Sequence, residues 1–229
     1  MNELFWVLLL LFNFTAVMIA YKCWGRLGLY IWIPLSVVIA NIQVTKTINL
    51  FGLEATLGNI VYASSFLVTD ILSESYGKKE SQRAVNIGFF SLLVLTGLMQ
   101  IALLFIPSSS DIASGALITI FSFMPRLALG SLVAYYVSNF CDINIFEYIK
   151  NKSKGKHLWL RNCGSTILSQ LIDSLIFTFI AFYGIYDNSI WFQIMITTYL
   201  LKFLVALLDT PFMYLAKYWF TNNKIKEII

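Results

Sequence analysis

Seven long apolar segments limit what this chain can fold into more than any other feature of its sequence. A run of about 20 apolar residues is long enough to cross the hydrocarbon core of a bilayer as a helix. Only 12% of the 229 residues are charged, whereas an average globular domain has about a quarter. Too few polar groups remain to cover a water-soluble particle. We therefore predict an all-α integral membrane protein of the cell membrane, folded as a bundle of about seven transmembrane helices. The expected spans lie near residues 4–21, 28–50, 55–72, 82–106, 112–139, 162–183 and 190–216.

The basic residues alternate along the chain and predict its orientation. Thirteen of the 16 lysines and arginines lie in or beside every second connection or in the C-terminal tail, whereas the other connections carry acidic residues. Because positive charge is retained on the cytoplasmic side, we expect the N-terminus outside and the C-terminus in the cytoplasm. Six or eight spans would break this alternation. The thirteen residues are Lys22, Arg26, Lys78, Lys79, Arg83, Lys150, Lys152, Lys154, Lys156, Arg161, Lys217, Lys224 and Lys226.

The whole chain, residues 1–229, is predicted to be a single transmembrane domain, because no room remains for a separate soluble domain. The net charge of +4 does not predict nucleic-acid binding, since topology explains the basic residues beside the spans. The first segment is expected to remain as a helix, because its positive charges follow the apolar run, unlike those of a signal peptide. Three cysteines without CxxC spacing predict neither a disulfide framework nor a metal site.

Charged side chains inside the apolar segments are the strongest functional signal. Each costs about 3 kcal/mol in hydrocarbon on insertion scales and usually faces a cavity or a partner. One interpretation is structural, because three acids and three bases can pair and hold helices together. The other is that they line a polar cavity. The six residues are Lys46, Asp70, Arg126, Asp173, Lys202 and Asp209.

Uncharged polar residues recur at helical spacing beside these charges. In the sixth expected span, Asn162, Thr166, Gln170 (or Ser169) and Asp173 fall on one stripe, opposite a face of isoleucine, leucine and phenylalanine. The spacing therefore predicts a helix with one polar face.

The second and third expected spans carry similar stripes. Asn41, Thr45 and Asn49 follow each other at intervals of four residues in the second. Tyr62 and Phe66 share one side of the third, with Asp70 one turn further. The two rings are either ordinary packing aromatics or platforms on which a flat ligand stacks.

Enzyme motifs are absent from the sequence. The single histidine, His157, lies in a basic connection, and neither HExxH, GxSxG nor a glycine-rich phosphate loop occurs. An aspartyl protease dyad of Asp70 and Asp173 is conceivable, but the neighbouring residues do not match such motifs. We predict that the chain is not an enzyme and needs no cofactor or metal.

Four stretches in order along the chain carry a resemblance to a known family. The decapeptide Thr69–Lys78 (TDILSESYGK) resembles the signature of the queuosine precursor transporters, which belong to the vitamin uptake transporters. The other three are Arg126 with Asp142 and Phe146, then Ser165-Thr166 with Asp173, then Lys202 with Pro211-Phe212-Met213-Tyr214.

The resemblance implies uptake of 7-cyano- or 7-aminomethyl-7-deazaguanine or queuine. It also implies a small helical fold similar to vitamin-binding S-components, with a six-helix core as an option. Asp209 lies outside the matching motifs. The positions that agree with the family pattern are Asn41, Asp70, Arg126, Asp173 and Lys202.

The chemistry of a deazaguanine suits these residues. Its ring N–H and exocyclic amine lie side by side, and a carboxylate accepts from both, so Asp173 or Asp70 is the candidate acceptor. We expect a cavity near the midplane that opens alternately to each side. Candidates to donate to the 6-oxo group are Arg126, Lys202, Gln170 and Asn41, and candidates to cover the ring face are Tyr62 and Phe66.

Several questions stay open at this level. Asp70 or Asp209 could carry a coupled proton, but facilitated exchange is equally compatible. Ala16 and Ala20 form an AxxxA pair of the kind with which a binding subunit docks on an energising partner, so an S-component-like subunit is the alternative. A third alternative is a structural membrane protein whose charges only pair. The expected partners are a nucleobase and lipid; a homo-oligomer is left open.

Overall fold

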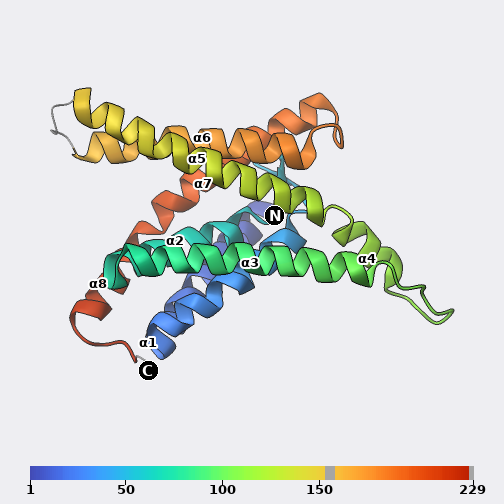
Figure 1. Ribbon diagram of the computed structural model, residues 1–229, viewed down its shortest axis with the longest axis horizontal. Helices are drawn as coiled ribbons and strands as arrows, with labels where there is room; N and C mark the ends of the chain where they lie inside the picture. The colour runs from blue at the N-terminus through green and yellow to red at the C-terminus, as the bar shows by residue number, and fades with distance from the viewer. Residues whose placement is uncertain (153–157, 227–229) are drawn as a thin grey trace.

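The computed structural model describes residues 1–152 and 158–226. In Figure 1, α5 and α6 lie together on one side, α2 and α3 lie on the other, and α7 runs between them. The packing agrees, since α5 and α6 form the most extensive helix pair, α1, α2 and α3 contact each other, and α7 contacts both groups. The elements are α1 (Asn2–Gln43), β1 (Thr47–Leu50), β2 (Leu53–Thr56), α2 (Asn59–Tyr76), α3 (Lys78–Ala102), α4 (Ser114–Phe121), α5 (Met124–Lys152), α6 (Leu158–Phe182), α7 (Asn188–Leu208) and α8 (Thr210–Thr221).

Helix α1 consists of two arms joined by a sharp turn at Gly25, whose φ of 54° suits glycine. The arms run antiparallel, because the Asn2 side chain at the start of the first donates to the Asn49 carbonyl beyond the end of the second, at 2.7 Å. At Gly28 a Cβ would lie 2.2 Å from the Ala20 carbonyl oxygen, so only glycine allows this close approach. The turn falls in the predicted connection Lys22–Leu27.

A β-hairpin corrects two predicted helix ends. The span expected over 28–50 ends as a helix at Gln43, and the next helix begins at Asn59 rather than residue 55. Strands β1 and β2 pair antiparallel between them, closed by a two-residue turn with φ of 53° at Phe51 and 80° at Gly52. Lys46, expected inside a span, is exposed just before β1.

Side chains of α7 and of the start of α1 hold this hairpin. The Glu54 backbone N–H donates to Gln193 Oε1 at 3.1 Å, and Thr197 Oγ1 donates to the Glu54 carbonyl at 3.0 Å, which ties β2 to α7. The Phe51 backbone N–H donates to Glu3 Oε1 at 3.2 Å, which ties the turn to the start of α1. The hairpin therefore covers the end of the bundle where the N-terminus lies.

Two further predicted spans are interrupted helices. The segment 112–139 divides into α4 and α5, and the segment 190–216 divides into α7 and α8 at Asp209. Pro211 lies in the first turn of α8, where its missing N–H is not needed.

Within the described ranges, four helical stretches are long and apolar enough to span a membrane. These are Asn2–Gln43, Lys79–Ala102, Ser114–Ser138 and Asn188–Thr221. The predicted class of helical membrane protein is confirmed, with the hairpin as an unforeseen addition. The count of seven spans, their orientation and the single domain stay predictions.

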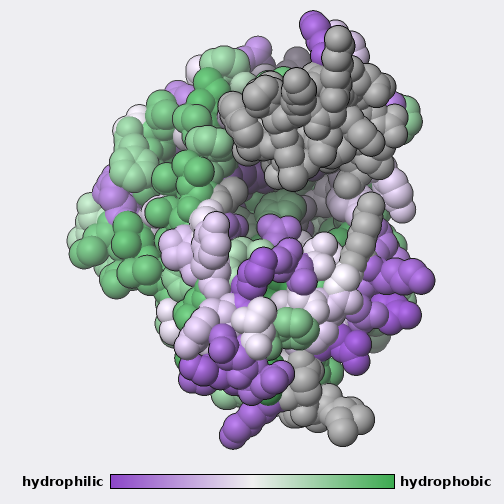
Figure 2. Space-filling view, turned by 90° about the vertical axis from the view of Figure 1, so that its left-hand side faces the viewer, coloured by the Kyte–Doolittle hydropathy of each residue, from purple (hydrophilic) through white to green (hydrophobic). Residues whose placement is uncertain are grey.

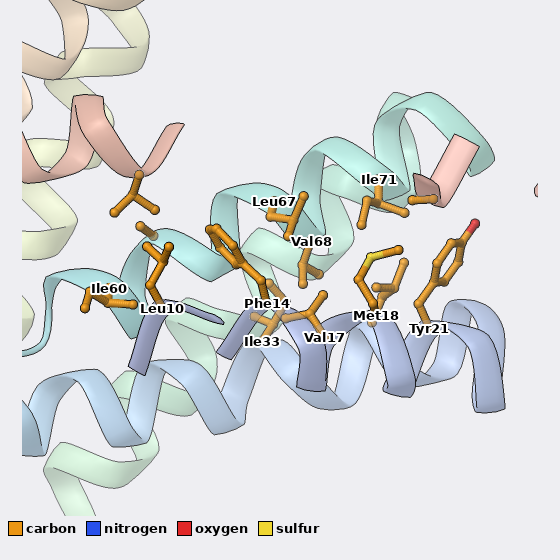
Figure 3. Close-up of a cluster of buried hydrophobic side chains, with 14 of the residues drawn as sticks. Leu10, Phe14, Val17, Met18, Tyr21, Ile33, Ile60, Leu67, Val68 and Ile71 are labelled. Atoms are coloured by element: carbon orange, nitrogen blue, oxygen red, sulfur yellow. The ribbon is translucent and has the colours of Figure 1, made fainter. Parts of the chain in front are cut away.

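The main apolar core joins α1 to α2. Figure 3 shows Phe14 and Val17 from the first arm of α1 beside Leu67 and Val68 from α2, with Ile33 from the second arm. Many other large apolar side chains stay exposed; on the face seen in Figure 2 hydrophobic residues cover one flank and hydrophilic ones gather below. Such exposed apolar area is expected where lipid, rather than water, surrounds the helices.

Candidate functional site

A cavity of about 420 Å³ lies between the two groups of helices, lined by residues of α1, α2 and α3 on one side and of α5 and α6 on the other. This volume is within the range of small-molecule sites, roughly 300–1,000 Å³. It extends from Asn41 and Tyr62 to Ser73 and Ser81, which flank the α2–α3 connection. A smaller space of about 40 Å³ continues from it toward the hairpin. The residues shared by both linings are Asn41, Tyr62, Ser131 and Asp173.

Asp173 and Lys202 form an ion pair at this shared wall. Lys202 Nζ on α7 donates to Asp173 Oδ2 on α6 at 2.6 Å, and the two residues are 6% and 8% exposed, respectively. Ser138 Oγ donates to the other carboxylate oxygen at 3.4 Å. The Lys202 ammonium lies 5.6 Å from the ring centre of Tyr62 and 5.9 Å from that of Phe177. The pair agrees with the structural interpretation, yet the cavity beside it leaves room for a ligand.

Aromatic rings line the large cavity from two sides. Tyr62 and Phe66 on α2 pack edge to face with centres 5.4 Å apart. Phe89 on α3 and Tyr135 on α5 do the same at 4.6 Å. All four line the cavity, so a flat ligand finds ring surfaces from three different helices. The first two were predicted; Phe89 and Tyr135 were missed, because nothing in their spacing distinguishes them from packing residues.

Two amides add hydrogen-bonding groups to the cavity. Gln170 Oε1 on α6 is buried and has no hydrogen-bond partner among the described residues, although Gln170 lines the cavity. An acceptor in this position is costly unless a ligand or water donates to it. Asn41 on α1 donates through Nδ2 to the Val37 carbonyl at 2.8 Å, so one of its two amide N–H donors is already used.

Asp70 lies further along the same cavity. Its side chain is accessible and lines the space one helical turn beyond Phe66. Asp209, at the junction of α7 and α8, is buried and lies within electrostatic reach of Asp70, but it lines neither space. Of the two predicted coupling residues, only Asp70 is therefore open to a ligand in the cavity.

Arg126 is not brought to the cavity. Its Nε donates to the Ile180 carbonyl and its Nη2 donates to the Tyr183 carbonyl at 2.5 Å, at the end of α6. The last carbonyls of a helix lack a partner inside it, and a guanidinium there complements the negative end of the helix dipole. The predicted role as a ligand donor therefore has no support from this placement.

Some residues named in the sequence analysis lie outside the part of the chain that the structure describes. These are the side chains of Lys78, Asp142, Phe146, Lys150, Arg161, Asn162, Cys163, Ser165 and Thr166, and the whole of Lys154, Lys156 and His157.

The described part of the chain is thus a multi-pass helical membrane protein with a ligand-sized polar cavity between two groups of helices. A family model described as "Putative vitamin uptake transporter" matches residues 56–216, and the chain belongs to this family. It is a transporter of the cell membrane rather than an enzyme, as predicted.

Named relatives support the same placement. A "Probable queuosine precursor transporter" of Bacillus subtilis (strain 168) is 48% identical over 224 residues, which cover 97% of this chain and 98% of the relative. The "Queuosine precursor transporter" of Escherichia coli (strain K12) is 26% identical over 171 residues, 73% of this chain and 75% of the relative. No solved structure matches the chain. The family resemblance read from the sequence is therefore confirmed.

Proposed function

We propose that this chain imports queuosine precursors, the 7-deazaguanine bases, through the cavity between the two helix groups by alternating access. The observation that supports this most is the lining itself, where aromatic rings, two carboxylates and an amide oxygen without a partner among the described residues surround a space of about 420 Å³. The names of the relatives point to the same class of cargo.

The ligand's donor edge faces α6 in this proposal. Asp173 offers Oδ1, which Ser138 holds only at 3.4 Å, and Gln170 offers Oε1 one turn away. Together they accept from the ring N–H and the exocyclic amine of a deazaguanine. Tyr62 and Phe66 would contact the ring. Asn41 lines both spaces and, with one amide N–H bonded to the Val37 carbonyl, keeps a second N–H for the base.

Ligand-dependent stabilisation is the first test. A base that binds the native state must raise the melting temperature of the purified protein, by an amount that grows with concentration. A protein whose charges only pair would show no shift with any deazaguanine.

Uptake by an Asp173→Asn variant is the second test. The substitution keeps the shape but replaces an acceptor oxygen with a donor, so uptake should fall at least about tenfold, as for loss of one charge-assisted hydrogen bond. Asp187→Asn, the same change in the α6–α7 connection outside both cavity linings, is the matched control. Wild-type uptake by a correctly inserted Asp173→Asn variant would show that the carboxylate does not bind the base.

A proton-coupled mechanism would give Asp70 and Asp209 a role in transport. In a proton-coupled carrier, one of these two carboxylates would take up the proton that moves with the base. The alternative is facilitated exchange without a coupled proton. Dissipating the proton gradient during uptake distinguishes the two mechanisms, because a proton-coupled carrier stops accumulating the base whereas facilitated exchange continues.

A second candidate is a binding subunit that needs an energising partner. An apolar groove of about 290 Å³ on the outside of α1, lined by Ala16, Ala20 and Gly28 among others, favours it, because a partner helix could dock there. Reconstitution of the purified chain alone distinguishes the two. Uptake into vesicles identifies a self-sufficient carrier, and binding without uptake identifies a subunit.

A further inference from the structure

The large cavity has an uneven charge. Asp70 and Asp173 both line it, whereas no described lysine, arginine or histidine does. Lys202 neutralises Asp173 from the smaller space on the other side of that carboxylate. In the described residues Asp70 has no ion-pair partner of its own, and Asp209, which interacts with it electrostatically, offers no positive charge. The region around Asp70 therefore attracts a cation.

Closing the cavity around a ligand makes this charge important. When water leaves, an ionised carboxylate without a partner becomes costly, and a neutral ligand offers no compensation. A ligand that carries an ammonium group supplies the missing partner. Phe66, one turn before Asp70 on the same face of α2, adds a ring surface on which a cation is favourable.

The two ends of the cavity then recognise different parts of the cargo. Asp173 and Gln170 lie on α6 and face the donor edge that all 7-deazaguanines share. Asp70 lies on α2, which belongs to the opposite wall of the same cavity, and in this inference it meets the substituent on the ring.

We infer that Asp70 is a specificity-determining residue, which makes the cavity select queuosine precursors with a protonated amine over neutral ones. This inference rests on the proposed function. The aminomethyl group of 7-aminomethyl-7-deazaguanine is an alkyl amine and is protonated at neutral pH, like a lysine side chain. The cyano group of 7-cyano-7-deazaguanine is uncharged, and the ring is the same in both.

Binding of these two bases to the purified protein tests the inference. We expect the wild-type protein to bind the aminomethyl base at least about tenfold more tightly than the cyano base, since a partly buried charge pair is worth more than a factor of ten in affinity. In Asp70→Asn the affinity for the aminomethyl base falls and that for the cyano base does not, so the ratio approaches one. Because both affinities are measured on one preparation, partial unfolding cancels from the ratio.

The matched control is Glu74→Gln, the same change one turn further along α2. Glu74 pairs with Lys217 at 2.6 Å and lines neither space, so the ratio of affinities should keep its wild-type value. A wild-type ratio of one, or a ratio that survives in Asp70→Asn, overturns the inference and leaves the proposed function standing. If neither base binds the wild-type protein, the proposed function fails and the inference fails with it.

Discussion

Lys202 and Asp173 are the two side chains whose placement depends most on each other. Each is almost fully buried, and they are joined at 2.6 Å. Removing one member of such a pair leaves an uncompensated charge, which typically costs about 3–5 kcal/mol, whereas removing both costs much less.

We therefore expect Lys202→Met to destabilise the protein by about 3 kcal/mol, at the lower end of this range because Asp173 also borders the cavity. Asp173→Asn combined with Lys202→Met should recover most of this loss. Thermal unfolding of Lys202→Met, Asp173→Asn and the double variant in one detergent measures both effects. A double variant whose loss of stability equals the sum of the two single losses would show that the two residues are not coupled.

Arg126 has a structural role at the end of α6. Arg126→Lys should lower the free energy of unfolding by on the order of 1–2 kcal/mol, because one ammonium cannot bridge the carbonyls of Ile180 and Tyr183 as the guanidinium does. Affinity for a deazaguanine should stay the same, since Arg126 lines neither space. Gln170→Met, which changes a residue of the cavity, is the comparison and should weaken binding. A large loss of affinity in Arg126→Lys would show that Arg126 does take part in ligand binding.

The sequence predicted the charged residues of the site more accurately than their partners. A charge in an apolar segment must face a cavity or a partner, and this reasoning located Asp70, Asp173 and Lys202. Arg126 obeys the same rule, but its partners are backbone carbonyls, which no side-chain pattern reveals. Tyr135 and Phe89 could not be predicted either, because a ring has the same spacing in a core and in a binding site.

At the scale of elements, the turn inside α1 depends on a glycine contact. Gly28→Ala would place a Cβ 2.2 Å from the Ala20 carbonyl oxygen, and overpacking of this kind costs roughly 1–3 kcal/mol. Gly97→Ala in α3 is the control, because a Cβ there meets nothing within 4 Å, and removing a helical glycine usually stabilises slightly. Melting temperatures should fall in the first variant and hold or rise in the second. Equal effects would mean that the close approach is not needed.

Helix positions followed from hydropathy, but the hairpin did not. Residues 47–50 and 55–56 fall in the two expected flanking spans and 51–54 in the expected connection, because length and hydropathy do not distinguish a short strand from the end of a helix. What makes them strands is a turn with two positive φ values, built here from Phe51-Gly52 rather than the Asn-Gly pair that signals such turns.

At the scale of the whole molecule, the direction of insertion is the main untested prediction. The alternation of basic connections predicts an N-terminus outside and a C-terminus in the cytoplasm. Single cysteines placed at Asn2 and Asn222, in a background where the native cysteines are replaced by serine, provide the measurement. A membrane-impermeant thiol reagent added to intact cells should label the first and not the second. Labelling of both, or of the second alone, would contradict seven spans in this orientation.

The hairpin at the N-terminal end has a mechanical consequence for a membrane protein. An unpaired backbone amide is expensive beside lipid, and most irregular loops cannot shift there without exposing some. Because β1 and β2 satisfy much of each other's backbone, a ribbon that moved away from the bundle would keep its own ladder intact. The bonds lost would be those to α7, to the start of α1 and to Tyr186, together with the burial of Leu50 and Ala55.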